Sequence, residues 1–87
     1  MTGVPTLAPH VRLRHDAARD QYVLLGPETV AVLNGTSAAI LRLCDGQRSV
    51  AEIIAELRGT YEHVAEDDVR GFLSRMVARH YVEITDG

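Results

Sequence analysis

The sequence predicts an α+β fold of winged helix-turn-helix architecture, with a small three-stranded antiparallel meander, three helices and a short C-terminal strand. Two observations lead to this fold class. Apolar residues alternate with polar ones early in the chain, as in strands with one buried face, and later recur every three or four residues, as in amphipathic helices. The first two predicted helices are joined only by "DGQRS", so we expect them to cross steeply, as in a helix-turn-helix.

The first ten residues contain two prolines and few large apolar groups. This composition predicts a flexible N-terminal arm over residues 1–10, leaving 11–87 as a single domain. Residues 11–15 and 21–25 are rich in strand-forming side chains and are separated by the loop-like "AARD". We therefore expect these two segments to pair as a hairpin.

A third strand is expected over "ETVAVL", residues 28–33, after Gly26-Pro27 breaks the second strand. Its period of two places Val30 and Val32 on one face. On the residues alone, the simpler interpretation is an ordinary strand that packs these valines on the core. The alternative is an open sheet edge to which another chain docks.

Helix start and stop signals place the first two helices. Thr36 or Ser37 is expected to cap the first, which Asp45-Gly46 ends. The second opens on a capping box formed by Ser49 and Glu52.

The third helix is expected over 67–80, after an acidic run, "EDD", that suits the positive end of the helix dipole. Its apolar positions fall at helical spacing and predict a core-facing stripe. The stripe consists of Val69, Phe72, Leu73, Met76 and Val77. The tail "YVEIT" alternates like a short closing strand.

The length of 87 residues limits the function. So short a chain buries roughly 60–65% of its unfolded surface and has little interior space for an active site. The sequence has no Gly-rich phosphate loop and no Ser-His-Asp set that spacing supports, so we expect a binding protein rather than an enzyme. The four histidines are scattered and lack cysteine partners at ligand spacing, so no metal or other cofactor is expected.

Charge and hydropathy limit the partners. Nine arginines and no lysine stand against twelve carboxylates, for a net charge of −3, which argues against nucleic acid. The longest apolar runs, such as "YVLL", are far shorter than the ~20 residues of a membrane-spanning helix. No secretory signal pattern is visible, and the lone Cys44 has no partner for an internal disulfide. Both features are typical of a cytoplasmic protein.

The order of these elements resembles the PqqD family. The resemblance is carried by "YVLLGPETVAVLNGTSAAILRLCDGQRSVAEIIAEL" and by the later "DDVRGFLSRMVARHYVEI". It covers nearly the whole chain from about His10. Two residues depart from the family pattern: Gly26 stands where an aromatic residue is expected, and His80 where a glycine usually precedes the final strand.

The resemblance implies a peptide chaperone of pyrroloquinoline quinone (PQQ) biosynthesis. Such a protein binds a ribosomally made precursor peptide and presents it to a radical S-adenosylmethionine enzyme that crosslinks a Glu and a Tyr of the peptide. It also implies that the peptide adds as a strand to 29–33 and rests on the third helix. The residues expected to contact the peptide are Thr29, Val30, Ala31, Val32, Leu33, Asp67, Arg70, Gly71, Ser74 and Arg75.

A DNA-binding winged helix-turn-helix regulator is the alternative. It would place the third helix in the major groove, but the acidic residues 66–68 at the start of that helix would repel phosphates. A monomer is expected for a chaperone whose sheet edge must stay open. The breaks at 26–27 and 34–35 leave a strand-swapped homodimer as the other oligomeric state.

Overall fold

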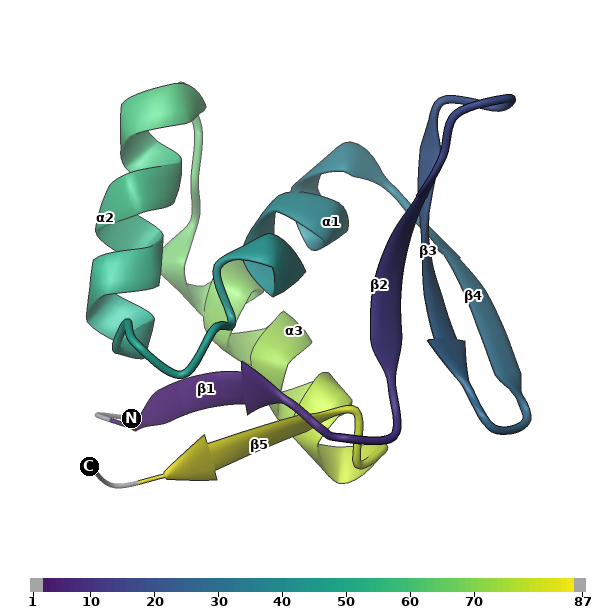
Figure 1. Cartoon of the computed structure of the whole chain (residues 1–87). Coiled ribbons are helices and arrows are strands. Elements are labelled where there is room, and N and C mark those ends of the chain that lie inside the picture. The colour runs from purple at the N-terminus through teal and green to yellow at the C-terminus, as the bar shows by residue number, and fades with distance from the viewer. Residues whose placement is uncertain (1–2, 86–87) are drawn as a thin grey trace.

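The computed structural model describes residues 3–85 of the protein (Figure 1). Its elements, in order, are β1 Val4–Leu7, β2 Arg12–Asp16, β3 Gln21–Gly26, β4 Thr29–Leu33, α1 Gly35–Arg42, α2 Val50–Thr60, α3 Glu66–Ala78 and β5 Val82–Thr85. Strands β2, β3 and β4 form an antiparallel sheet in that order, while β1 and β5 form a separate two-stranded sheet. The predicted α+β class, with its three-stranded meander, three helices and C-terminal strand, is confirmed.

The N-terminal segment is more ordered than the sequence predicts. Residues 4–7 pair antiparallel with β5, from Val4 opposite Thr85 to Leu7 opposite Val82. The prediction of a flexible arm is therefore wrong for these residues, while residues 1–2 of that arm lie outside the described part of the chain. Prolines suggested a loop, but an edge strand tolerates proline. The partner strand, β5, lies at the other end of the chain, so no local sequence pattern predicts the pairing.

The first helix starts earlier than predicted. Asn34, rather than Thr36 or Ser37, is its N-cap, and the Asn34 Oδ1 atom accepts a hydrogen bond of 2.7 Å from the Ser37 N–H. The helix ends at Arg42, before the predicted stop at 45–46. Gly46 nevertheless adopts the positive φ, +78°, for which glycine is favoured.

The capping box of α2 is confirmed. The Ser49 Oγ atom accepts from the Glu52 N–H at 3.1 Å, and the Glu52 Oε1 atom accepts from the Ser49 N–H at 2.9 Å. The hydrogen bond that the Ser49 N–H donates to the Glu52 carboxylate is the largest cause that lowers the pKa of Glu52 from its usual 4.5, and the Ser49 side chain adds to this shift. The stabilisation is therefore complete above pH 4.5 and is lost as the pH falls through the lower pKa of the folded state.

Replacing Ser49 by alanine is expected to lower the free energy of unfolding by about 1 kcal/mol, because the Glu52 N–H loses its acceptor. Urea denaturation at neutral pH measures this loss, and Ser74→Ala, at an exposed position of α3, is the matched control.

The negative charge of the Glu52 carboxylate is tested separately with Glu52→Gln. The difference in the free energy of unfolding between wild type and Glu52→Gln should shrink as the pH is lowered through 4.5. A stability difference that is constant from pH 7 to pH 3 would contradict this role of the carboxylate.

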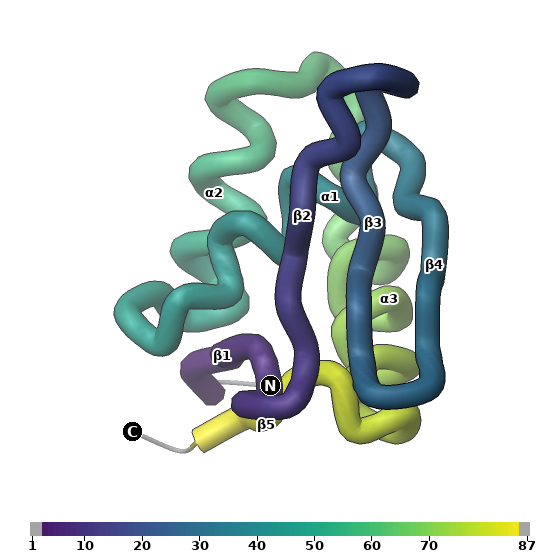
Figure 2. The backbone as a smooth tube through the Cα atoms, turned by 45° about the vertical axis from the view of Figure 1, so that its right-hand side comes forward, coloured from purple at the N-terminus to yellow at the C-terminus, as the bar shows by residue number. Residues whose placement is uncertain are grey.

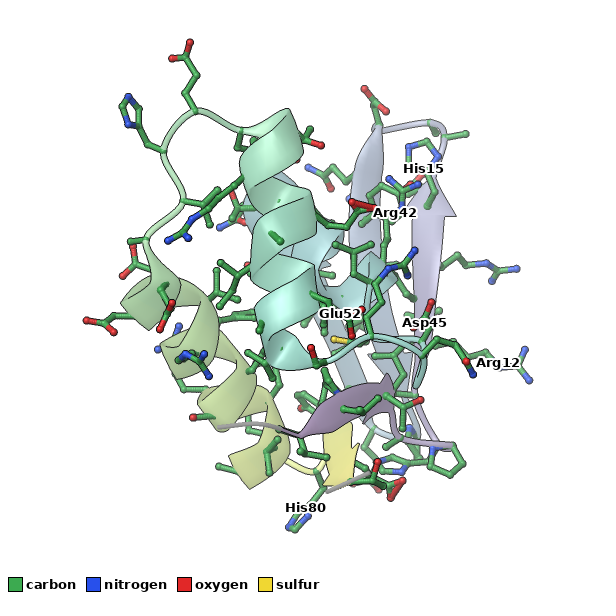
Figure 3. All side chains as sticks on the ribbon, turned by 90° about the vertical axis from the view of Figure 1, so that its left-hand side faces the viewer. Arg12, His15, Arg42, Asp45, Glu52 and His80 are labelled. Atoms are coloured by element: carbon green, nitrogen blue, oxygen red, sulfur yellow. The ribbon has the colours of Figure 1, made fainter. Side chains whose placement is uncertain are left out.

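The third helix leads into β5 through a left-handed residue. Helix α3 covers 66–78 rather than the predicted 67–80, and the tail forms β5 as predicted. His80, which follows the C-cap Arg79, has φ of 63°. Its side chain projects from the end of α3 into solvent (Figure 3). The position where the family pattern has glycine is thus one that glycine suits.

We expect His80→Gly to raise the free energy of unfolding by about 0.5–1 kcal/mol. A non-glycine residue pays roughly 1–2 kcal/mol in the left-handed region, and the larger unfolded-state entropy of glycine cancels part of that gain. Ala78→Gly, which introduces glycine at the last residue of α3, where the backbone is still helical, should instead destabilise the protein. Thermal unfolding of both variants measures the contrast, and two shifts of the same sign would refute the explanation.

One core joins the helices to the inner side of both sheets. Its most deeply buried side chains include Leu24, Leu41, Ile53, Leu73, Val50 and Val82. The predicted stripe of α3 is confirmed, since Val69 and Leu73 are buried and Phe72, Met76 and Val77 pack against them.

Cys44 belongs to this core and is 4% exposed. Burial raises the pKa of its thiol to about 12, with the neighbouring Asp45 carboxylate adding to the shift, and the thiol donates to the Ile40 carbonyl oxygen at 3.3 Å. Cys44 is therefore protonated and unreactive at neutral pH.

Candidate functional site

Strand β4 forms one edge of the three-stranded sheet (Figure 2). It pairs with β3 from Gly26 opposite Thr29 to Tyr22 opposite Leu33, and no other strand pairs with it within residues 3–85. In an antiparallel ladder, alternate residues of an edge strand direct their N–H and C=O groups away from the sheet. Strand β4 therefore offers hydrogen-bonding groups to an added extended segment.

The two faces of β4 differ in their surroundings. Ala31 and Leu33 are half-buried and pack against the core. Val30 and Val32, on the opposite face, are 74% and 62% exposed. The structure thus excludes the simpler interpretation of this strand, in which the valines pack on the core. The period of two in the sequence correctly separated the two faces of β4. The valines, however, lie on the outer face and not on the face that packs against the core.

Helix α3 lies behind the β3–β4 side of the sheet and runs in the opposite direction to β4 (Figure 2). At the start of β4, the Tyr81 Oη atom, just beyond α3, donates to the Thr29 Oγ1 atom at 3.3 Å. Just beyond the other end of β4, Asn34 and the first turns of α1 border a hollow of about 210 Å³ together with α3 and the loop before it. No residue of β4 itself lines this hollow. The hollow therefore begins one residue beyond the C-terminal end of the edge strand.

The hollow has an apolar floor and a polar rim. Its apolar lining residues are Ile40, Tyr61, Val64, Ala65, Val69 and Phe72, and its polar ones include Asn34, Ser37, His63, Asp68 and Arg75. A small number of polar groups around an apolar surface is the usual composition of a ligand site in proteins. Arg75 is exposed and has no ion-pair partner within the described part of the chain. Its guanidinium is available to an acidic group.

The residues predicted on α3 separate into different faces. Arg75 lines the hollow together with Asp68 and Phe72, which share its face at i, i+4 and i+7 spacing. Sequence reasoning missed Asp68 and Phe72 because the phenylalanine was assigned wholly to the core. The i, i+4, i+7 spacing from Asp68 through Phe72 to Arg75 was the sequence signal that could have placed both residues on the same face as Arg75.

The other predicted residues of α3 lie elsewhere. Asp67, Gly71 and Ser74 share a separate face and are not among the lining residues. The Arg70 Nε atom donates to the Glu66 Oε2 atom at 3.1 Å, one turn earlier in the helix. A Cβ on Gly71 would meet only the Arg75 Nη1 atom at 3.6 Å, which is ordinary contact, so local packing does not require glycine there.

Among residues 3–85, no three His, Cys, Asp or Glu side chains are placed to hold a metal ion. The helices described are too short or too polar to cross a membrane. The fold and the site define a class of protein: a small α+β domain that exposes a strand edge beside an apolar hollow.

Comparison with known proteins identifies the family. The family model described as "Coenzyme PQQ synthesis protein D (PqqD)" matches residues 21–82. A PqqA binding protein of Pseudomonas aeruginosa is 36% identical over 86 residues, covering 97% of this chain and 94% of its own. Another, of Methylococcus capsulatus, is 43% identical over 68 residues, 77% of this chain and 73% of its own. The chain belongs to the PqqD family.

A solved structure agrees with this assignment, and a second one shares the fold. The solution structure of the PqqD truncation of Methylobacterium extorquens PqqCD, described as a functional, stand-alone recognition element for ribosomally synthesized and post-translationally modified peptides, matches with a TM-score of 0.75. It is 35% identical, and the match covers 92% of this chain and 88% of that one. The heterocyclase TruD contains a similar fold, with a TM-score of 0.68 and 24% identity over 95% of this chain and 12% of its own.

Proposed function

We propose that this protein is a peptide chaperone of PQQ biosynthesis, which binds the ribosomally made precursor peptide and presents it to a radical S-adenosylmethionine enzyme. The observation that carries the proposal is the open edge of β4 beside α3. It is supported by relatives named PqqA binding protein and by the structural likeness to a peptide recognition element. The role is one of binding, with no chemical step on this chain.

Binding occurs by strand addition. The peptide lies along β4, where its backbone groups satisfy the outward N–H and C=O groups of alternate residues. Its side chains on the inner face point toward the hollow, so an apolar anchor packs on Phe72 and its neighbours. Affinity comes mainly from these two sources. An acidic side chain of the peptide that pairs with the exposed Arg75 adds about 0–1 kcal/mol.

We also assign the β2–β3–β4 sheet and the three helices to the winged helix-turn-helix architecture. In a DNA-binding member of that architecture, a basic recognition helix enters the major groove. Helix α3 instead carries Glu66, Asp67 and Asp68 in its first turn. These carboxylates disfavour the DNA-binding alternative, and an open β4 is consistent with a monomer.

The test is a titration of isotope-labelled protein with synthetic precursor peptide, followed by NMR. Backbone amide shifts are expected in β4 (29–33) and on the hollow side of α3 (68–75). Strand β2 (12–16), at the opposite edge of the same sheet, is the internal control and should shift little. Unchanged amides in 29–33 at tens of micromolar peptide would overturn strand addition, and uniform small shifts would indicate non-specific contact.

A further inference from the structure

The three-stranded sheet has a second face, which the peptide site does not use. Directly opposite residues on paired strands turn their side chains to the same side of a sheet. The strand register therefore places two rows on the outer face, away from α1 and α3: Arg12, Leu25 and Val30 in one row, and Arg14, Val23 and Val32 in the next.

The four aliphatic residues of these rows form an outer apolar patch, consisting of Val23, Leu25, Val30 and Val32. None of them packs against the core, and the two valines of β4 are mostly exposed. In Figure 2 the helices α1 and α3 lie behind the sheet, so no described helix covers this face. Contiguous exposed apolar residues on a small protein commonly mark an interaction site.

The outer apolar patch has a cationic border on β2. The side chains of Arg12 and Arg14 are exposed and have no ion-pair or hydrogen-bond partner within residues 3–85. Arg12 projects away from the body of the molecule (Figure 3). An arginine on an edge strand also prevents edge-to-edge aggregation, which accounts for these residues alone. This role does not account for the exposed valines Val30 and Val32, which lie on the same face at the opposite edge of the sheet.

We propose that the outer apolar patch and its two arginines form the docking surface for an acidic protein partner, the enzyme that receives the peptide. This inference rests on the proposed function. An apolar centre with a charged rim is the usual anatomy of a protein interface, and unpaired arginines complement carboxylates on the partner.

The position of the patch connects docking with presentation. A peptide strand added to β4 would place every second side chain on the outer face, next to Val30 and Val32. The patch and these peptide side chains would then form one continuous surface. The enzyme therefore contacts the chaperone and its cargo together, and it binds the loaded protein more tightly than the empty one.

Two kinds of variant separate docking from peptide binding. Val30→Thr/Val32→Thr removes apolar surface but keeps the branched side chains and the backbone N–H groups of β4. Arg14→Glu reverses the charge of the border, and Arg58→Glu, at an exposed position of α2 with no ion-pair partner in the described chain, is the matched control. Because all these positions are exposed, thermal unfolding should confirm that each variant folds.

The experiment measures two dissociation constants: that of the synthetic precursor peptide, and that of the purified radical S-adenosylmethionine enzyme for the peptide-loaded protein. We expect the double Val variant and Arg14→Glu each to weaken enzyme binding by about tenfold. In Arg14→Glu, which lies on β2 at the opposite edge from the added peptide, peptide binding should change by less than about threefold. Arg58→Glu should change neither constant.

The possible failures are distinguishable. If wild-type protein does not bind the peptide, the proposed function fails. If peptide binding is intact but the patch variants bind the enzyme as wild type does, the docking inference is overturned and the proposed function stands. A wild-type dimer in sedimentation that the double Val variant abolishes, with enzyme binding unchanged, would instead assign the patch to a second copy of this chain. If the double Val variant does not fold, the enzyme binding of Arg14→Glu alone tests the docking inference.

Discussion

Val32→Pro is expected to weaken binding of the precursor peptide by between about tenfold and a hundredfold without unfolding the protein. Proline removes the backbone N–H that an added strand would use, and leaves a peptide carbonyl without its donor. A net hydrogen bond is worth about 0.5–1.5 kcal/mol and an unsatisfied buried acceptor costs about 1–3 kcal/mol. The two losses together come to about 1.5–4.5 kcal/mol. Since about 1.4 kcal/mol is tenfold in affinity, the range stated corresponds to the lower part of this sum, up to about 2.8 kcal/mol.

Position 32 is chosen from the strand register. Gly26 and Thr29 flank a loop of two residues, which predicts that they form a hydrogen-bonded pair. Pairs then alternate, so Val30 and Val32 direct their backbone groups outward, where proline breaks no bond to β3. The same alternation makes His15 an outward residue on β2, the other edge, and His15→Pro is the matched control.

Calorimetric titration with the peptide measures the effect, and circular dichroism checks the fold. Val32→Thr, which keeps the N–H, should bind the peptide nearly as wild type does. Equal losses for Val32→Pro and His15→Pro would mean that proline disturbs the sheet as a whole. No loss for Val32→Pro would place the peptide elsewhere than on β4.

The parts of the fold that sequence predicted are those with local causes. The capping box of Ser49 and Glu52 fixed the start of α2, and the 3.6-residue spacing of Val69 and Leu73 fixed the buried face of α3. The pairing of β1 with β5 was missed because it joins the two ends of the chain. Its energy comes from a partner distant in sequence, and the prolines of the segment gave the opposite local signal.

The candidate site was predicted in part. Strand 29–33 lies at a sheet edge, as the family resemblance implies, although the peptide contacts themselves stay a prediction. Sequence spacing could not choose the face of α3 that borders the hollow, because that depends on how the helix is rotated about its axis by core packing. Phe72 shows the difficulty: one side chain packs on the core and also lines the hollow.

Leu73→Ala is expected to lower the free energy of unfolding by about 3–5 kcal/mol. Leu73 is 0% exposed in the centre of α3, so truncation leaves a cavity that the surrounding side chains fill only partly. A domain of 87 residues has a total stability of roughly 4–13 kcal/mol. The loss is thus a large share of the total, and the midpoint of thermal unfolding should fall by at least about 12 °C.

The matched control is the same truncation on the outer apolar patch. Leu25→Ala removes equal volume from a side chain that does not pack against the core, so it should cost less than about 1 kcal/mol. Peptide binding should weaken in Leu73→Ala, because Leu73 supports the helix whose other face carries Phe72 and Arg75. Equal destabilisation by the two variants would mean that the outer face is covered in solution. That result would point to a second copy of the chain on the patch and would count against its being free for the enzyme.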